Sequence, residues 1–139
     1  MINQGRILAV DYGEKRIGLA LSDPMRMFAK PYMVLANNGI QDTITTINGI
    51  VAQNSISLVI VGMPYAIDGT FTPKTTETKA FADALSKALC VAVIDYDERY
   101  STCSADDELK KMGYTWQESR KIKDAMAACM FLKEYLESL

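Results

Sequence analysis

The organisation of the chain follows from residues 6–22, which read RILAVDYGEKRIGLALS. Two apolar runs, 6–11 and 16–22, lie on either side of a short polar segment that contains Gly13. Short apolar runs bounded by turn residues are typical of buried β-strands, and so short a link joins antiparallel neighbours. The first run ends in Asp11, and burying a carboxylate is costly unless it is paired or binds a metal. Asp11 is therefore the first candidate functional residue.

The remaining apolar patterns predict a mixed sheet covered by helices. A third strand over 30–36 completes an antiparallel meander, although Pro31 weakens its start. Helical and strand patterns then alternate, with strands over 58–61 and 90–95, a polar loop over 65–75, and helices over 41–53, 76–89, 104–112 and 115–136. This order predicts an α/β fold, a five-stranded mixed sheet with helices on both faces. At 139 residues, the chain is expected to form one domain over residues 1–139.

A second candidate acid follows the predicted fifth strand. Glu98 comes after the apolar run 91–94 and stands in a cluster with Asp95 and Asp97. Ligands of such sheets gather at the carboxyl ends of adjacent strands, where Asp11 is also expected. The acid that acts there could be Asp97 in place of Glu98, and the alternative role of Glu98 is that of a surface acid.

The third candidate acid lies in the last predicted helix. Asp124 interrupts a helix that is apolar over most of its circumference, which indicates a largely buried helix. Such an acid is a poor candidate for a simple solvated side chain, and its alternative role is an ion pair with Arg120 or Lys121. If Asp11, Glu98 and Asp124 converge, their oxygens form a site for a hard divalent cation.

The composition excludes several classes of chemistry. The chain has no histidine, which rules out Ser-His-Asp and Cys-His catalysis and histidine zinc sites. Its three cysteines lack CxxC spacing, so we expect neither a disulfide framework nor a thiolate zinc site, and we expect a cytoplasmic location. We also expect no membrane span and no secretory signal. The net charge of −2 means that nucleic-acid binding requires a local basic patch.

Four blocks of the sequence resemble the YqgF family, a RuvC-like branch of the ribonuclease H fold superfamily. The family is described as Holliday junction resolvases and pre-16S rRNA nucleases. The first block is 9–20, AVDYGEKRIGLA, and the second is 61–64, VGMP, which an Asp-Gly pair follows. The third is 97–102, DERYST, and the fourth is 123–128, KDAMAA. The blocks cover nearly the whole chain in the family's order.

The resemblance implies a ribonuclease H-like fold and a metal-dependent endonuclease that hydrolyses phosphodiester bonds in structured nucleic acid. It implies that Asp11, Glu98 and Asp124 are the catalytic residues and the ligands of Mg²⁺ or Mn²⁺, with Asp11 bridging where two ions bind. The implied substrates are the 5′ end of pre-16S rRNA, in ribosome biogenesis, and branched DNA such as a Holliday junction. Basic residues close to the acids in sequence are candidates for phosphate contacts: Lys15, Arg16, Arg99 and Lys121.

Several alternatives stay open at this point. The principal one is a non-catalytic nucleic-acid-binding module of the same fold, which an absence of metal-stimulated cleavage would favour. A phosphotransferase of the actin-like ATPase superfamily is a third reading, but such enzymes need two domains of this kind. The sequence does not distinguish RNA from DNA, one metal ion from two, or a monomer from a homodimer. Ribosomal precursor particles are a further expected partner.

Overall fold

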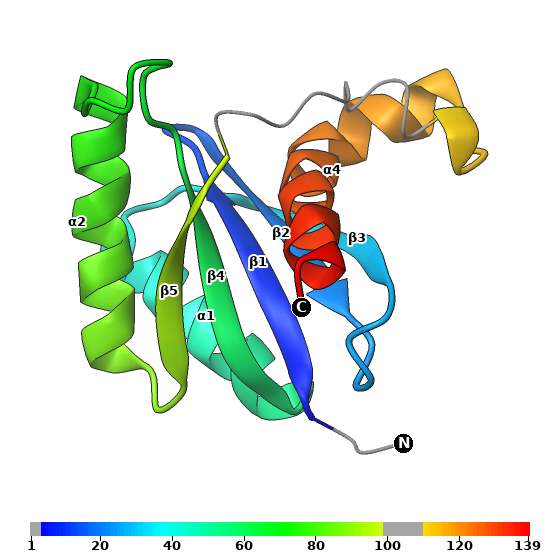
Figure 1. Cartoon of the computed structure of the whole chain (residues 1–139), viewed down its shortest axis with the longest axis horizontal. Coiled ribbons are helices and arrows are strands. Elements are labelled where there is room, and N and C mark those ends of the chain that lie inside the picture. Colours follow the sequence, from blue (N-terminus) through cyan, green and yellow to red (C-terminus); the bar gives the residue numbers. More distant parts are fainter. Residues whose placement is uncertain (1–3, 99–109) are drawn as a thin grey trace.

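The described part of the chain folds around one five-stranded sheet. The structure is a computed structural model and describes residues 4–98 and 110–139. The strand order is β3-β2-β1-β4-β5, in which β1, β2 and β3 are antiparallel neighbours and β4 and β5 run parallel to β1 (Figure 1). The predicted mixed sheet and its meander are confirmed. The elements in chain order are β1 (Arg6–Tyr12), β2 (Arg16–Ser22), β3 (Ala29–Ala36), α1 (Ile40–Gln53), β4 (Ile56–Met63), α2 (Pro73–Ala88), β5 (Ala92–Asp97) and α4 (Trp116–Glu137).

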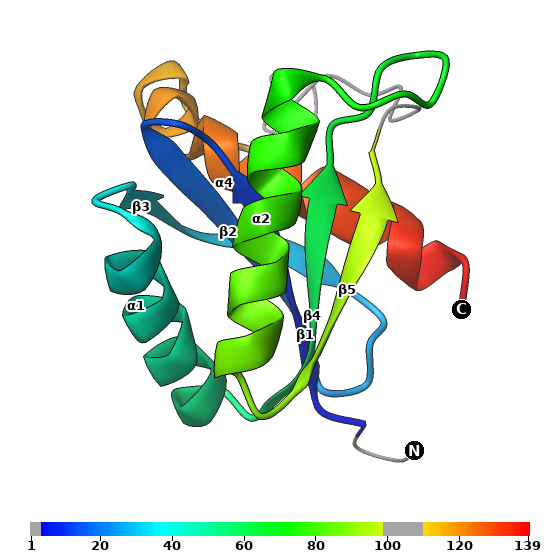
Figure 2. The same cartoon turned by 90° about the vertical axis from the view of Figure 1, so that its left-hand side faces the viewer.

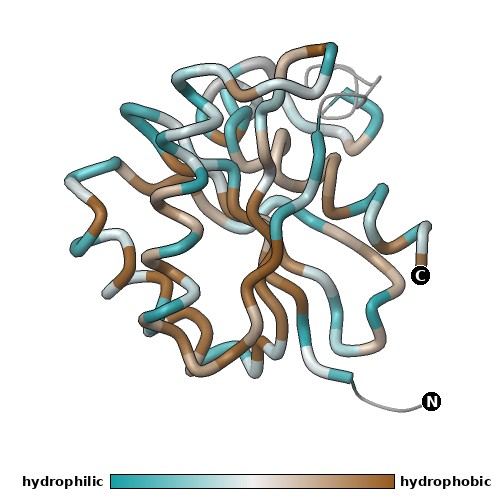
Figure 3. Tube along the Cα trace, turned by 60° about the vertical axis from the view of Figure 1, so that its left-hand side comes forward, coloured by the Kyte–Doolittle hydropathy of each residue, from teal (hydrophilic) through white to brown (hydrophobic). Residues whose placement is uncertain are grey.

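Helices cover both faces of the sheet, as predicted. The helices α1 and α2 pack on one face and α4 crosses the other (Figures 1 and 2). Leu8 and Val10 of β1 join the core under α1 and α2, while Ile7 and Ala9 join the core under α4. All four side chains are buried, because a central strand between two helical layers has no face toward solvent. Figure 3 shows the apolar central strands surrounded by more polar outer segments.

The strand that carries a proline lies at an edge of the sheet. Pro31 of β3 pairs with Ala20 of β2, where the register between the two strands shifts. Proline cannot donate a backbone hydrogen bond, so it is tolerated at edges and bulges. The predicted third strand therefore forms despite Pro31.

The helix α2 begins three residues earlier than predicted, at Pro73. The hydroxyl of Thr72 accepts a hydrogen bond from the Thr75 N–H at 3.2 Å, and the Thr75 hydroxyl accepts one from the Thr72 N–H at 3.1 Å. This reciprocal cap, with proline in the first turn, stabilises a helix start that the apolar spacing alone does not reveal. The loop predicted over 65–75 is correspondingly shorter.

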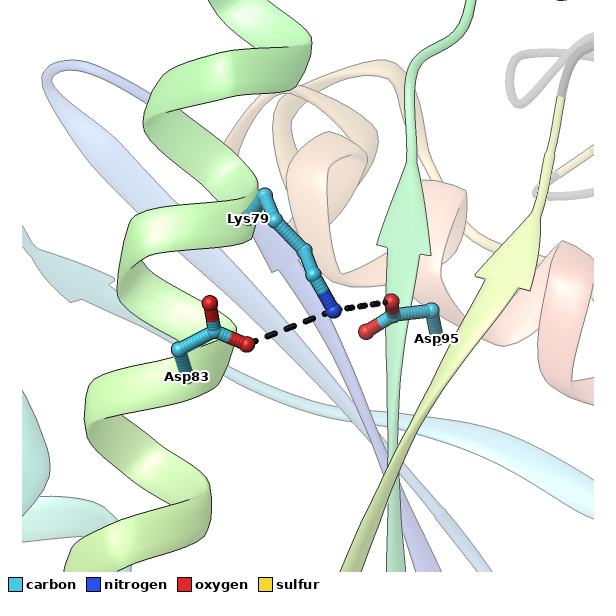
Figure 4. A network of polar contacts seen from close by, with 3 residues as sticks. All are labelled: Lys79, Asp83 and Asp95. Atoms are coloured by element: carbon cyan, nitrogen blue, oxygen red, sulfur yellow. Dashed lines mark hydrogen bonds and ion pairs between the residues drawn. The ribbon is translucent and has the colours of Figure 1, made fainter.

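The strand β5 forms the other edge, and α2 is held against it. The strand β5 spans Ala92–Asp97, two residues later than predicted, because its parallel pairing continues to the last residue of β4. The Lys79 ammonium of α2 lies 2.8 Å from Asp95 Oδ2 and 3.3 Å from Asp83 Oδ1 (Figure 4). Asp95, one of the three acids clustered in the sequence, therefore makes a structural contact between helix and strand.

The last predicted helix is α4. Thr115 caps it, and Thr115 and Glu118 form a capping box. The helix predicted over 104–112 lies largely outside the described residues. In residues 4–98 and 110–139, none of the helices has the length and hydropathy that a membrane crossing requires.

Candidate active site

The candidate site lies at the edge of the sheet where β1, β4 and β5 end. Asp11 is the next-to-last residue of β1, is partly buried and pairs with Gly18 of β2. Val10 pairs with Val61 of β4, so the next residue of each strand, Asp11 and Gly62, follows at the same edge. The carboxyl ends of parallel strands are where ligands bind in open α/β sheets.

The carboxylate of Glu98 lies in space left by a glycine. Glu98 directly follows β5, and its N–H donates to the Met63 carbonyl oxygen at 3.4 Å. A Cβ atom added to Gly62 would lie 2.5 Å from Glu98 Oε2 and 2.7 Å from the Phe131 ring. Because Gly62 has no side chain, the Glu98 carboxylate can lie over the end of β4, between β5 and β1. Asp97, the alternative acid, is exposed.

Burial and like charge perturb two of the three candidate acids. Burial, and after it the negative charge of Asp11, raises the pKa of Glu98 from 4.5 to about 7. Burial also raises the pKa of Asp11, which the charge of Lys74 lowers and that of Asp124 raises. In this pair Asp11 ionises first, and Glu98 then titrates in the field of the Asp11 charge. Glu98 therefore retains a proton over part of the neutral range, and a nearby cation would favour its release.

The backbone of α4 sets the position of Asp124. A Cβ atom added to Gly18 would meet the carbonyl oxygen of Asp124, so the helix contacts β2 directly at this residue. Since Gly18 pairs with Asp11, the contact brings Asp124 to the Asp11 end of the sheet. The side chain of Asp124 is 40% exposed, more open than the apolar helix predicts.

The ion pair considered as an alternative role of Asp124 is present with another partner. Asp124 Oδ2 accepts from Arg16 Nε at 2.8 Å, and Arg16 begins β2. The sequence alone suggests Arg120 or Lys121 of the same helix as the partner. The pair joins residues 108 positions apart, so no local spacing could have indicated it.

The three acids gather at one edge but do not form a complete metal cluster. Asp11 interacts electrostatically with both other acids. Its charge raises the pKa of Glu98, and the charge of Asp124 raises the pKa of Asp11. Among residues 4–98 and 110–139, no three acidic or cysteine side chains meet closely enough to hold one ion. Asp11 and Glu98 therefore form the central pair, and Asp124 is held to one side by Arg16.

A basic residue outside the predicted phosphate-binding set also acts on this pair. Lys74 is the second residue of α2, and its charge lowers the pKa of both Asp11 and Glu98. It is exposed and borders a hollow of about 330 Å³ together with Tyr12 and Glu14. The signal in the sequence is the Thr-Pro-Lys helix start soon after β4, which places a lysine near the carboxyl edge.

The four predicted phosphate-binding residues differ in where they lie relative to the candidate acids. Arg16 lies at the site through its ion pair with Asp124. Lys15, in the β1–β2 turn, and Lys121, one turn before Asp124 in α4, are exposed. Arg99 lies outside the described residues. Among the described residues of this set, Arg16 thus contacts a candidate catalytic acid directly.

A family model described as RuvX, Holliday junction resolvase, matches residues 5–138. The chain belongs to the RuvX family. RuvX and YqgF name the same family, so the resemblance is confirmed. This RuvX-family chain is 34% identical over 132 residues to a protein of Syntrophomonas wolfei subsp. wolfei named "Putative pre-16S rRNA nuclease". The alignment covers 95% of the chain and 94% of that relative.

Solved structures share the fold of this RuvX-family chain. The fowlpox virus resolvase in complex with its substrate Holliday junction DNA has a TM-score of 0.58 at 15% identity, covering 96% of the chain and 97% of that protein. Thermus thermophilus RuvC with a Holliday junction substrate has a TM-score of 0.54 at 12% identity, covering 96% and 94%. The predicted ribonuclease H-like fold is confirmed.

Proposed function

We propose that this RuvX-family chain is a metal-dependent endonuclease that hydrolyses phosphodiester bonds in structured nucleic acid. The observation that carries the proposal is the Asp11–Glu98 pair. Two carboxylates with raised pKa values lie at the carboxyl edge of the sheet, with Gly62 between them. Two ionised carboxylates so close together repel each other, which costs free energy of folding. A divalent cation between them would offset that cost. Family membership gives the class of reaction.

The donor set fits Mg²⁺ or Mn²⁺, because these ions prefer carboxylate oxygens and retain several waters. Asp11 and Glu98 would hold the ion, and Asp124 would complete the site once Arg16 releases it. A bound ion supplies a more acidic water and stabilises charge on the leaving oxygen. Glu98 is partly buried and lies in the field of the Asp11 charge, whereas Asp97 is exposed, which supports Glu98 as the ligand.

The basic residues would orient the nucleic acid. The charge of Lys74 reaches both central acids, so its ammonium can bind the phosphate that approaches them. Arg16, freed from Asp124, would contact a neighbouring phosphate, with Lys15, Lys121 and Arg99 extending the contact along the backbone.

The substrate class follows from what the relatives and neighbours are called. The relative's name specifies pre-16S rRNA, and both structural neighbours are held with Holliday junctions. We propose structured RNA of a ribosomal precursor, or branched DNA, as the substrate of this chain. Residues 1–139 would act as one nuclease domain in the cytoplasm, with ribosomal precursor particles as a partner.

A cleavage assay on matched variants tests the proposal. Wild-type protein with Mg²⁺ or Mn²⁺ should cut a structured RNA carrying the 5′ flank of 16S rRNA or a four-way DNA junction. The amide variants Asp11→Asn, Glu98→Gln and Asp124→Asn should lose on the order of 100-fold or more in rate, because each loses a ligand charge. The exposed neighbour is the matched control, and Asp97→Asn should cleave as wild type does.

Two outcomes would contradict the proposal in different ways. If Asp97→Asn loses cleavage and Glu98→Gln retains it, the ligand is Asp97. If wild-type protein binds nucleic acid but never cleaves it with either metal, the chain is a non-catalytic binding module. The Arg16–Asp124 ion pair is the observation that favours this second function, because it occupies one of the three acids.

A further inference from the structure

The turn between β4 and α2 exposes two large apolar side chains beside the candidate site. We call residues 65–71, Tyr-Ala-Ile-Asp-Gly-Thr-Phe, the β4–α2 turn. Ile67 is 85% exposed and Phe71 is 55% exposed. Exposed apolar side chains that lie in one turn beside a candidate site are the kind of surface that can contact a ligand.

Hydrogen bonds within the turn fix its shape. The N–H of Ala66 donates to the Thr70 carbonyl oxygen at 3.0 Å, and the N–H of Gly69 donates to the Ala66 carbonyl oxygen at 2.8 Å. Asp68 Oδ1 accepts from both the N–H and the hydroxyl of Thr70, at 3.0 and 2.7 Å. The Asp68 carboxylate is therefore engaged within the turn, where it supports the backbone beside the apolar tip.

Two contacts anchor the ends of the turn. The Phe71 ring lies 5.6 Å from the Tyr65 ring, tilted by 53°, so one aromatic side chain supports the other. The hydroxyl of Thr75, in the first turn of α2, donates to the Pro64 carbonyl oxygen at 2.6 Å. Phe71 is thus held by its neighbours while more than half of its surface faces solvent.

The turn lies at the same edge of the sheet as the acid pair. It starts two residues after Met63, whose carbonyl oxygen accepts from the Glu98 N–H. Phe71 precedes Lys74 by three residues, and the charge of Lys74 acts on both Asp11 and Glu98. Figure 2 shows the turn at the end of the sheet toward which β4 and β5 point.

We propose that the β4–α2 turn is a base-stacking element, in which Phe71 takes the face of an unstacked base, with Ile67 beside it. The inference rests on the proposed function and names its substrate class: nucleic acid with an unpaired or splayed base next to the scissile phosphate. Every base offers a π-face to an exposed aromatic ring. Lys74 supplies the cation for the adjacent phosphate. The apolar Phe71 and the charged Lys74 thus match the base and the phosphate of one nucleotide. A continuous duplex offers no such face, because its bases are stacked on each other.

Affinity measured without divalent metal tests the stacking role separately from cleavage. The probes are a labelled DNA duplex with a two-base bulge and the same duplex without it, followed by fluorescence anisotropy in EDTA. Phe71→Ala and Phe71→Leu should weaken binding of the bulged probe by on the order of 10-fold. Phe71→Trp should bind as tightly as wild type, and all variants should bind the continuous duplex equally.

A second exposed phenylalanine provides the matched control. Phe28 is 72% exposed, and its N–H donates to Asp23 Oδ1 at 2.8 Å, so it too lies in an ordered turn. That turn joins β2 to β3 at the opposite end of the sheet (Figure 1). Phe28→Ala should leave both affinities unchanged. Thermal melts of every variant check the fold, and Phe71→Leu keeps apolar packing on Tyr65 if alanine does not.

Three outcomes would overturn the stacking proposal. These are unchanged affinity of Phe71→Ala for the bulged probe, equal weakening for both probes, and full retention of binding by Phe71→Leu. Unchanged affinities would leave the apolar tip as a contact for a protein instead. The assay needs no metal and leaves every candidate catalytic acid intact. Its result therefore tests the stacking role even if the nuclease proposal fails.

Discussion

Replacing Gly18 with alanine perturbs the contact that brings Asp124 to the site. The added Cβ would meet the carbonyl group of Asp124 and lie 2.8 Å from the Ala125 nitrogen. These are backbone atoms of a helix buried in the core, so they cannot rotate away and α4 must retreat by on the order of 1 Å. Overpacking of this kind costs about 1–3 kcal/mol. We expect the upper end of that range, because Met126, Cys129 and their neighbours in α4 are also buried against the sheet.

Urea unfolding and thermal melts measure this cost, and Gly49 supplies the control. A destabilisation of about 3 kcal/mol lowers the melting temperature of a chain this size by roughly 10 °C. Gly49 lies in α1, and a Cβ there would have nothing within 4 Å. Gly49→Ala should therefore stabilise the protein by up to about 1 kcal/mol, through helix propensity.

The same substitution should also affect cleavage. A retreat of about 1 Å moves Asp124 away from Asp11, and displacements of that size can lower catalytic rates on the order of 100-fold. If Gly18→Ala is as stable and as active as wild type, the close crossing of α4 over β2 is refuted, and with it our account of how Asp124 reaches the site.

Three further predictions concern charge. The pKa of Glu98 is raised from 4.5 to about 7 in the folded protein, so the free energy of unfolding should fall as pH rises through that interval. Urea titrations at pH 5 and 8 measure this fall, and Glu98→Gln should abolish up to about 3 kcal/mol of it. Mg²⁺ or Mn²⁺ at about 100 times its dissociation constant should stabilise wild type by about 3 kcal/mol in a thermal melt. An equal response from Asp11→Asn would exclude Asp11 as the bridging ligand. Arg16→Ala should cost less than about 1 kcal/mol, since its ion pair is exposed, yet lower the salt slope of nucleic-acid binding by about one; Lys30→Ala, on β3, should change neither.

The sheet could be predicted because its signals are local. The strands β1 and β4 are central and buried, so their sequences are continuous apolar runs, and the short link through Gly13 fixed the antiparallel pairing with β2. The start of α2 was predicted too late because its cap depends on side-chain hydrogen bonds between Thr72 and Thr75, which apolar spacing does not record.

The candidate acids were predictable, but the groups that control them were not. Asp11 interrupts an apolar pattern near its end, and Asp124 does so within a helix, which makes both visible in the sequence. Arg16 meets Asp124 across 108 residues, and Lys74 reaches the pair only because α2 starts near the end of β4. In the sequence, Gly62 indicates only the end of a strand. The structure is needed to see that it leaves room for the Glu98 carboxylate.

The location of bound manganese tests the central claim most directly. Crystals of the wild-type protein soaked in Mn²⁺ and measured at the manganese absorption edge report the ion through its anomalous signal. We predict a peak about 2.1 Å from carboxylate oxygens of both Asp11 and Glu98, with Arg16 withdrawn from Asp124. A saturating soak that gives no peak between Asp11 and Glu98, in a protein that cleaves with Mn²⁺, would contradict the account.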